Sequence, residues 1–260
     1  MMDLPPLVEF LGVLADAAAK AIMPHFRATL AVENKLAVGF DPVTAADRDG
    51  ESAMRALIAD RYPSHGVLGE EFGPDREDAE YVWVLDPIDG TRAFITGVPV
   101  WGILIGLMHR GVPIAGMMHQ PFTEERFVGD GKRAWYSRGK ATQPLATRPC
   151  PDIAQASLFT TSPHLFRGPD RIAYDRLESQ VRLARYGCDC YAFCMVAAGQ
   201  ADVVVETELQ PYDIVALIPI VEGAGGRVTG WEGKSAARGG RAAAAGDPKL
   251  HEKVLRILTA

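Results

Sequence analysis

The stretch Trp83-Val84-Leu85-Asp86-Pro87-Ile88-Asp89-Gly90-Thr91 carries the strongest structural signal in the chain. The apolar residues from Tyr81 to Leu85 predict a buried strand, because such a short run bounded by turn signals is typical of one. Pro87 fixes one backbone angle and lacks a backbone donor, so the stretch also predicts that the strand stops there and the chain turns. A turn at the end of a buried strand is where functional side chains are commonly held.

Two carboxylates lie three residues apart in this turn. Asp86 and Asp89 can project toward one point, with the carbonyl of Ile88 between them and Gly90 permitting close approach. Magnesium takes such oxygen ligands and is usually held by one or two carboxylates together with substrate phosphate oxygens. Thr91 adds a hydroxyl beside such a site. The alternative is an ordinary turn, since Asp-Pro and Asp-Gly pairs are common there.

Further acidic residues occupy similar settings. Glu70 and Glu71 follow the short apolar step Gly66-Val67-Leu68, which predicts a second strand end. Asp213 is predicted in the first turn of a helix, and Asp47 near the opening of another. Each of the last two has a simpler explanation, because a carboxylate in a first turn interacts with the helix dipole or caps the helix. Together the acidic groups offer enough oxygen ligands for two or three magnesium ions.

The order and spacing of these motifs resemble the inositol monophosphatase family over nearly the whole chain. The motifs are Val43-Thr44-Ala45-Ala46-Asp47, Gly69-Glu70-Glu71, Asp86-Pro87-Ile88-Asp89-Gly90-Thr91, Tyr212-Asp213-Ile214-Val215-Ala216 and Glu222-Gly223-Ala224-Gly225-Gly226. Within the family, four segments are most similar to the histidinol-phosphatase branch. These are Thr91-Arg92-Ala93-Phe94-Ile95, Thr161-Ser162-Pro163-His164, the run from Gly187 to Phe193, and Pro211-Tyr212-Asp213. The resemblance implies a layered αβαβα sandwich, a magnesium-dependent phosphatase and a homodimer.

The resemblance also implies roles for single residues. Glu70, Asp86 and the Ile88 carbonyl would bind one ion, and Asp86, Asp89 and Asp213 a second. Two such ions activate water and stabilise the leaving oxygen when a phosphate monoester is hydrolysed. A dyad of Thr91 and Asp47 would orient the attacking water. Glu71 is a further possible member of the site.

The second half of the chain is expected to recognise the organic part of the substrate. The family resemblance places Gly187, Cys188, Asp189 and Glu206 there, with Asp89, Gly90 and Thr91 at the phosphate and His164 as a possible contact. A carboxylate at Asp189 suits a cationic substrate such as histidinol phosphate, because a charge-assisted hydrogen bond discriminates well. One alternative is that Asp189 caps the helix expected from Cys190 to Gly199. Another is that the substrate is inositol 1-phosphate or a related sugar phosphate.

Composition agrees with an enzyme acting on a small molecule. The 260 residues are 48% hydrophobic with a net charge of −6, and no basic run points to nucleic acid. We expect two tightly joined halves, 1–145 with most metal ligands and 146–260 with the substrate-recognition residues. No signal peptide or apolar membrane span is evident, which predicts a cytoplasmic protein. Four cysteines, Cys150, Cys188, Cys190 and Cys194, do not make a disulfide framework in a chain of this size. Cys188, Cys190 and Cys194 lack a fourth ligand at a zinc-like spacing and are expected to be buried thiols at the start and on one face of a helix.

Periodicity predicts the other elements. Helices are expected at 5–28, from Thr44 toward Tyr62, at 169–180 and 212–223, and at the C-terminus from 248 to 258. Residues 101–108 and 114–119 are expected to form a hairpin, and 157–161 and 203–206 short strands. The tract from Ala236 to Ala245, rich in glycine and alanine, is expected to be a loop.

Overall fold

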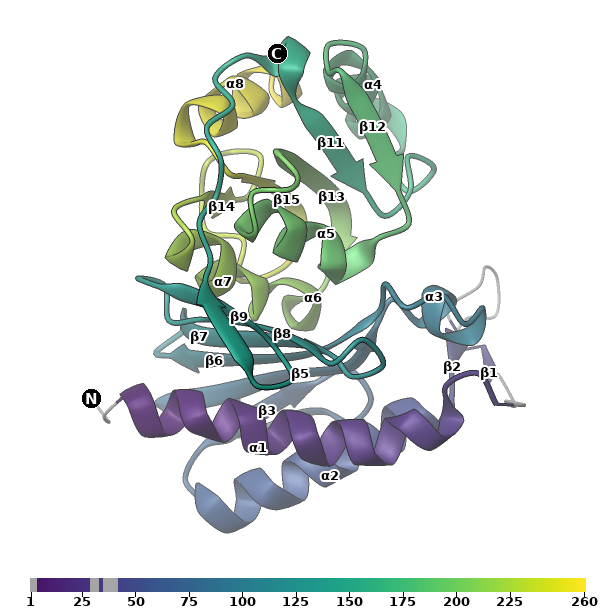
Figure 1. Ribbon diagram of the computed structural model, residues 1–260, viewed down its shortest axis with the longest axis vertical. Helices are drawn as coiled ribbons and strands as arrows, with labels where there is room; N and C mark the ends of the chain where they lie inside the picture. Colours follow the sequence, from purple (N-terminus) through teal and green to yellow (C-terminus); the bar gives the residue numbers. More distant parts are fainter. Residues whose placement is uncertain (1–3, 29–32, 35–41) are drawn as a thin grey trace.

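The computed structural model describes residues 4–28, 33–34 and 42–260, arranged in five layers (Figure 1). From one end to the other, these layers are α1 and α2, an eight-stranded sheet, α5 with α6 and α7, a five-stranded sheet, and α4 with α8. The helices are α1 (Leu4–Ile22), α2 (Ala45–Arg61), α3 (Thr91–Ile95), α4 (Gly168–Glu178), α5 (Asp189–Ala197), α6 (Pro211–Ile214), α7 (Leu217–Gly223) and α8 (Pro248–Leu258), with 3-10 turns η1 (Met23–His25) and η2 (Ile153–Gln155). The predicted αβαβα sandwich is confirmed.

The two large sheets come from successive parts of the chain. The first has the order β10-β9-β8-β7-β6-β5-β3-β4 and the second β12-β11-β13-β15-β14, while β1 and β2 form a separate pair. The strands are β1 (Glu33–Asn34), β2 (Pro42–Val43), β3 (Gly66–Gly69), β4 (Gly73–Asp75), β5 (Tyr81–Asp89), β6 (Gly102–His109), β7 (Val112–Gln120), β8 (Glu125–Gly129), β9 (Ala134–Arg138), β10 (Ala141–Pro144), β11 (Ser157–Thr160), β12 (Leu183–Tyr186), β13 (Val203–Leu209), β14 (Arg227–Thr229) and β15 (Gly240–Ala245). The predicted hairpin is confirmed as β6 and β7, which pair His109 with Val112 at their turn.

Alternation along the strands builds the cores between the layers. In β5, Trp83 and Leu85 face α1 and α2, whereas Val82 and Val84 face the middle helices. Both faces of this strand are covered, so its sequence is almost continuously apolar. Among the described residues, no helix combines the length and apolar character needed to cross a membrane.

The prediction that the strand stops before Pro87 is wrong. Strand β5 continues to Asp89, and its pairing with β6 shifts register between Asp86 and Asp89. A bulge accommodates proline, because the residue there does not have to donate a ladder hydrogen bond. The bulge therefore takes the place of the expected turn and directs the two aspartates.

The expected loop from 236 to 245 is also wrong in part, because residues 240–245 form strand β15 inside the second sheet. Ala242 and Ala244 pack in the core toward the middle helices, and Ala243 and Ala245 pack toward α4 and α8. The small side chains suit a strand that is covered on both faces. The glycine- and alanine-rich composition, which is typical of loops, therefore did not indicate that β15 is an internal strand. The expected helix from 212 to 223 is divided into α6 and α7, and α1 ends at Ile22, before the η1 turn.

A row of glycines positions α6 and α7 on the first sheet. Gly106, Gly116 and Gly129 lie opposite one another on β6, β7 and β8. A methyl group on Gly116 would lie 1.9 Å from the carbonyl oxygen of Ala216, and one on Gly129 would lie 2.2 Å from that of Pro219. The backbone after Asp213 therefore rests directly on the sheet, which brings that aspartate to the end of β5.

We expect Gly116→Ala to lower the free energy of unfolding by roughly 1–3 kcal/mol, because the added methyl group must displace backbone in a packed interface. Chemical denaturation measures this change. Gly12→Ala in α1 is the matched control, since its methyl group would meet only an Arg126 nitrogen at 3.8 Å. The control should be stabilised by up to about 1 kcal/mol through helix propensity. Equal effects of the two substitutions would contradict the role of the glycine row.

Candidate metal centre and active site

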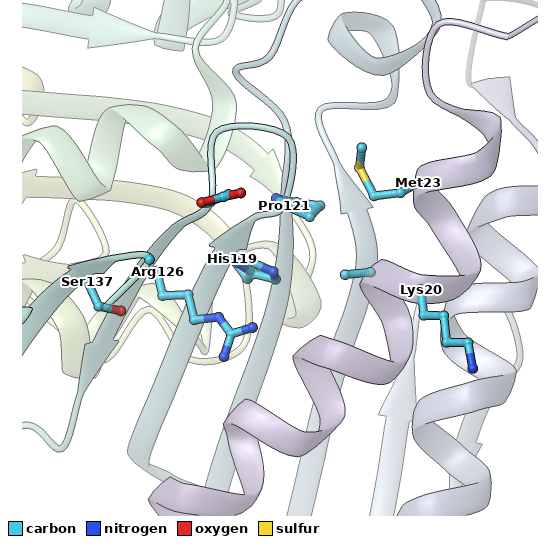
Figure 2. Close-up of a pocket in the computed structure, with 9 residues that line it drawn as sticks. Lys20, Met23, His119, Pro121, Arg126 and Ser137 are labelled. Atoms are coloured by element: carbon cyan, nitrogen blue, oxygen red, sulfur yellow. The ribbon is translucent and has the colours of Figure 1, made fainter. Parts of the chain in front are cut away.

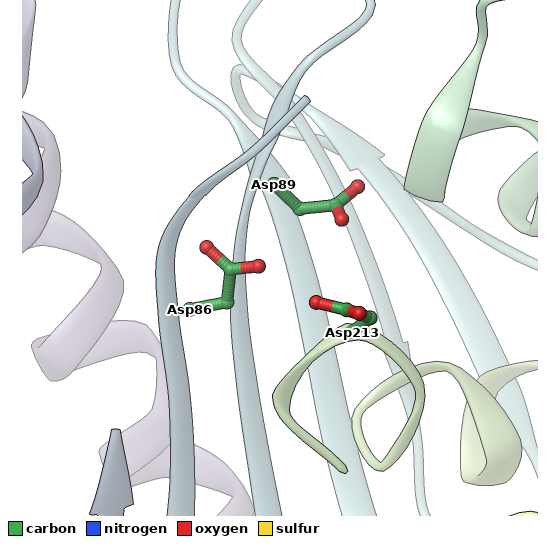
Figure 3. A group of neighbouring side chains, drawn as sticks. All are labelled: Asp86, Asp89 and Asp213. Atoms are coloured by element: carbon green, nitrogen blue, oxygen red, sulfur yellow. The ribbon is translucent and has the colours of Figure 1, made fainter. Parts of the chain in front are cut away.

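Three carboxylates converge where the first sheet meets the middle helices (Figure 3). Asp86 and Asp89 come from the end of β5 and Asp213 from α6. One oxygen from each lies within 4.8 Å of the others. Asp86 is buried, and the other two are half-buried. The structure thus brings together three of the predicted ligands from segments more than a hundred residues apart.

Local hydrogen bonds fix the orientation of two of these side chains. Asp86 Oδ1 accepts from the backbone N–H of Ile88 at 3.0 Å, which closes the bulge around Pro87. Asp213 Oδ2 accepts from the backbone N–H of Gln210 at 2.7 Å, in a capping box at the start of α6. The predicted first-turn position of Asp213 is confirmed, and this capping bond orients a candidate ligand.

The electrostatics of the cluster favour a bound cation. Burial raises the pKa of Asp86 well above its usual range, and the charges of Glu70, Asp89 and Asp213 add to the effect. Burial likewise raises the pKa of Asp89, together with the charges of Asp189 and Asp213. Like charges this close cannot all ionise without compensation. An all-oxygen donor set under such repulsion fits a hard divalent cation such as magnesium.

Glu70 joins this cluster from the end of β3. Its backbone N–H donates to the carbonyl of Leu85 at 3.2 Å, beside the parallel pairing of β3 with β5. Its side chain hydrogen-bonds to Asp86, which contributes to the raised pKa of that aspartate. Glu71 donates its backbone N–H to Glu51 at 2.7 Å. The expected strand end before Glu70 is confirmed, and the side chain contacts one of the three clustered aspartates.

Thr91 and Asp47 have clear local roles. Asp47 Oδ2 accepts from the N–H of Thr44 at 2.8 Å and from its hydroxyl at 2.7 Å, so the helix-capping alternative for Asp47 is confirmed. Thr91 begins α3, and its hydroxyl donates to the carbonyl of Ile88 at 3.2 Å. That carbonyl is itself a predicted ligand. The proposed dyad of Thr91 and Asp47 stays a prediction.

The start of α5 connects the second half of the chain to the metal centre. The backbone N–H of Cys190, in the first turn of this helix, donates to Asp89 Oδ2 at 2.7 Å. Cys188 is the residue before the helix and makes no capping bond with its side chain. Asp189 is the first helical residue, with a φ of +42°. The alternative that Asp189 caps α5 is therefore wrong, because Asp89 accepts the bond from across the chain.

Asp189 lies beside Gly90 in a cavity of about 310 Å³. A methyl group on Gly90 would lie 3.0 Å from Asp189 Oδ2, so glycine allows this approach as well as its own φ of +87°. The lining residues are Arg92, Ala93, Thr96, Val98, Val100, Thr161, Ser162, Gly187 and Asp189. Burial raises the pKa of Asp189, and a hydrogen bond with Thr161 and the charge of Arg92 oppose the increase.

Arg92 and Thr161 were quoted in the sequence motifs but not assigned to the site. Arg92 follows Thr91 directly, and Thr161 follows the end of β11. Both positions, next to a predicted site residue or at a strand end, could have indicated a place in the site. The structure brings them to Asp189 from opposite halves of the chain. The cavity therefore contains both signs of charge beside the metal centre.

The remaining predicted substrate residues lie at different depths. Glu206 is buried and accepts from the Thr160 hydroxyl and from both the N–H and hydroxyl of Thr161. Burial raises its pKa to about 8 despite these bonds. His164 is exposed, and its N–H donates to the Ser162 hydroxyl. Cys188 is half-buried, which differs from the expected burial.

A larger cavity of about 530 Å³ lies between α1 and the strands β7 to β9 (Figure 2). Lys20, His119 and Arg126 are among its lining residues, and none of the predicted site residues is. Burial lowers the pKa of His119 to about 4, which keeps this imidazole neutral. Across the described part of the chain, Asp86, Asp89 and Asp213 form the one cluster with metal-ligand geometry, and the cysteines contribute none.

Comparisons with known proteins agree with this geometry. The family model for the inositol monophosphatase family matches residues 3–260. The bifunctional phosphatase IMPL2, chloroplastic, of Arabidopsis thaliana is 44% identical over 95% of this chain and 73% of its own length. A histidinol-phosphatase of Chlorobaculum parvum is 35% identical over 85% of this chain and 84% of its own. A solved inositol monophosphatase from Zymomonas mobilis superposes with a TM-score of 0.89 and 39% identity over the whole of both chains. The chain therefore belongs to the inositol monophosphatase family of phosphatases.

Proposed function

We propose that this phosphatase hydrolyses histidinol phosphate to histidinol and phosphate with magnesium. The observation that carries the substrate assignment is Asp189, a carboxylate in a cavity that adjoins the metal centre. An ammonium group entering the cavity would gain a charge-assisted hydrogen bond there, which a neutral hydroxyl cannot match. The histidinol-phosphatase relative at 35% identity supports the same substrate.

The candidate metal ligands would form two magnesium sites that share Asp86. Glu70, Asp86 and the Ile88 carbonyl would hold one magnesium ion, and Asp86, Asp89 and Asp213 a second. Bound magnesium supplies positive charge that activates water and stabilises the leaving oxygen. The carboxylates would determine where that charge lies, because hydrogen bonds already orient them. Asp86 accepts from Ile88 in the bulge, Asp213 accepts from Gln210 in the cap of α6, and the backbone of Glu70 donates to Leu85.

Thr91 and Asp47 would position the attacking water. The Thr91 hydroxyl donates to the Ile88 carbonyl, at the first residue of α3. In the proposed dyad, the Thr91 hydroxyl would donate to Asp47 and accept from the attacking water. Asp47 is held in place by its capping bonds to Thr44, so it can receive the proton without moving.

Asp189 would bind the ammonium group, and the buried Glu206 would add a second negative charge close to Asp189. The bonds from Thr160 and Thr161 hold Glu206 in place, and the charge of Asp189 contributes to its raised pKa. A cation at Asp189 would favour ionisation of both carboxylates. Gly187 and Cys188 form the backbone that leads into α5, so the substrate pocket and the ligand Asp89 are connected through Cys190.

The second candidate substrate is inositol 1-phosphate. The solved inositol monophosphatase at 39% identity favours it, and it would use the same metal centre. Arg92 in the cavity is compatible with a hydroxyl-rich ligand as well as with a phosphate. A homodimer, a cytoplasmic location and the division of the chain at 145 stay predictions from the sequence.

The metal-free protein should lose on the order of 1 kcal/mol or more of stability between pH 7 and pH 8, above the range in which histidines with lowered pKa values, such as His119, change the stability. The pKa values of Asp86, Asp89 and Glu206 are raised by folding, the last from 4.5 to about 8. The folded state therefore binds more protons than the unfolded state, and deprotonation destabilises it. Denaturant unfolding in EDTA measures the slope, and magnesium should stabilise the protein more at pH 8 than at pH 5. A stability that rises between pH 7 and pH 8 would contradict the electrostatic account.

Asp89→Asn should lower kcat/KM at saturating magnesium by at least about a hundredfold, or about 2.7 kcal/mol. The amide oxygen can still accept from Cys190, so the contact to α5 survives while the charge is lost. Phosphate release measures activity, and unfolding in EDTA should show equal or greater stability. Asp60→Asn, at an exposed position of α2, is the control and should retain full activity. Retained activity of Asp89→Asn would refute the ligand assignment.

Substrate choice is tested by the ratio of kcat/KM for histidinol phosphate to that for inositol 1-phosphate. We expect a ratio of about a hundred or more, and a decrease of about tenfold or more in Asp189→Asn. Asparagine tolerates the positive φ at this position, so the variant removes the charge and preserves the backbone. Glu252→Gln, exposed on α8, is the control. A ratio near one in the wild type would favour inositol 1-phosphate or a broader range of sugar phosphates.

A further inference from the structure

The loop that carries Glu70 is fixed from α2 by a carboxylate outside the metal centre. Glu51 Oε2 accepts from the backbone N–H of Glu71 at 2.7 Å, and its Oε1 accepts from that of Phe72 at 3.3 Å. Glu70 itself donates its N–H to Leu85 at 3.2 Å. Three consecutive backbone amides are thus held, and the middle of the loop cannot shift without breaking one of these bonds.

Arg55 completes this arrangement one helical turn later. Its Nε donates to Glu51 Oε1 at 2.7 Å, and its Nη2 donates to the carbonyl of Gly73. Its guanidinium also lies 6.0 Å from the centre of the Phe72 ring. Glu51 thus accepts from the backbone N–H groups of Glu71 and Phe72, and Arg55 donates to the backbone carbonyl of Gly73. Every residue of the loop from Glu71 to Gly73 is bound by one of these two side chains.

The fit between Glu51 and the strand end is close. Glu51 is fully buried, and a methyl group on Gly69 would lie 1.9 Å from its Oε1. Burying a carboxylate is costly unless donors satisfy it. Here those donors come from Arg55 and from the two residues that follow Glu70, so the buried charge is satisfied only when the loop has this conformation.

Spacing along α2 relates this pair to the active site. Asp47, Glu51 and Arg55 are separated by four residues each, which places them on one face of the helix. Asp47 is the predicted partner of Thr91, and Glu51 holds the backbone of Glu70. One helix face therefore supports both the predicted water-orienting residue and a predicted metal ligand.

We propose that Glu51, with Arg55, is a positioning residue that sets the magnesium affinity of the site by fixing the backbone of Glu70. The inference rests on the proposed magnesium dependence and is independent of which phosphate ester is the substrate. Partners that orient metal ligands typically contribute 10–100-fold to metal affinity when they are tested by substitution.

The test is calorimetric titration of magnesium into the metal-free protein and its variants. Glu51→Ala should weaken magnesium binding by about 10–100-fold, because both loop amides lose their acceptor. Glu51→Gln should show a smaller loss, since one amide oxygen remains to accept. Phosphate release should show a raised magnesium requirement, with kcat largely recovered at high magnesium. Arg55→Met should show an intermediate loss, since Glu51 remains to hold the loop.

Two control variants separate positioning from general destabilisation. Met54→Ala removes a buried side chain of the same helix that belongs to the core against the sheet, so it should lower the melting temperature and leave magnesium affinity unchanged. Asp60→Asn removes an exposed charge and should change neither. Wild-type affinity in both Glu51 variants, or an equal loss in Met54→Ala, would overturn the inference. Absence of magnesium binding by the wild type would overturn the metal proposal itself. Magnesium binding by the wild type with the same affinity in Glu51→Ala and Glu51→Gln would overturn only the role of Glu51.

Discussion

Repulsion among carboxylates held close together is the constraint on which the rest of this structure depends. Asp86, Asp89 and Asp213 place oxygens within 4.8 Å of one another, with Glu70 hydrogen-bonded to Asp86. In the absence of a cation, each charge makes ionisation of the others less favourable. The surrounding fold must therefore supply enough stability to hold them in place, and a divalent cation converts the same repulsion into binding energy.

Several backbone devices provide that support. A bulge around Pro87 directs the two aspartates of β5, and the row of glycines on β6, β7 and β8 lets the backbone after Asp213 rest against the sheet. The N–H of Cys190 donates to Asp89 and connects helix α5 to the candidate metal centre. Each of these features acts through backbone groups or through glycine. The positions of the aspartates therefore depend on how the first sheet packs against the middle helices.

The predictions from sequence were correct where a local pattern is compatible with a single type of secondary structure. The helix from 248 to 258, the hairpin of β6 with β7 and the strand end before Glu70 followed from periodicity and turn residues. They failed where tertiary context overrode local preference. Pro87 lies inside a strand because a bulge needs no donor there, and the alanines of β15 form a strand because pairing with β13 and β14 and burial against helices on both faces override their composition. Glu51 was not identified, because one buried glutamate in a helix has no distinctive sequence signal.

The sequence by itself determined the family, the layered fold and the set of acidic residues, since these follow from motif order and from the oxygen chemistry that magnesium requires. Only the tertiary structure decided which groups meet. Asp89 accepts from Cys190 across 101 residues, Arg92 lies with Asp189 in one cavity, and Glu51 holds the loop after Glu70. Such contacts depend on how sheets and helices pack, because side chains distant in sequence converge only when the buried surfaces between them exclude water.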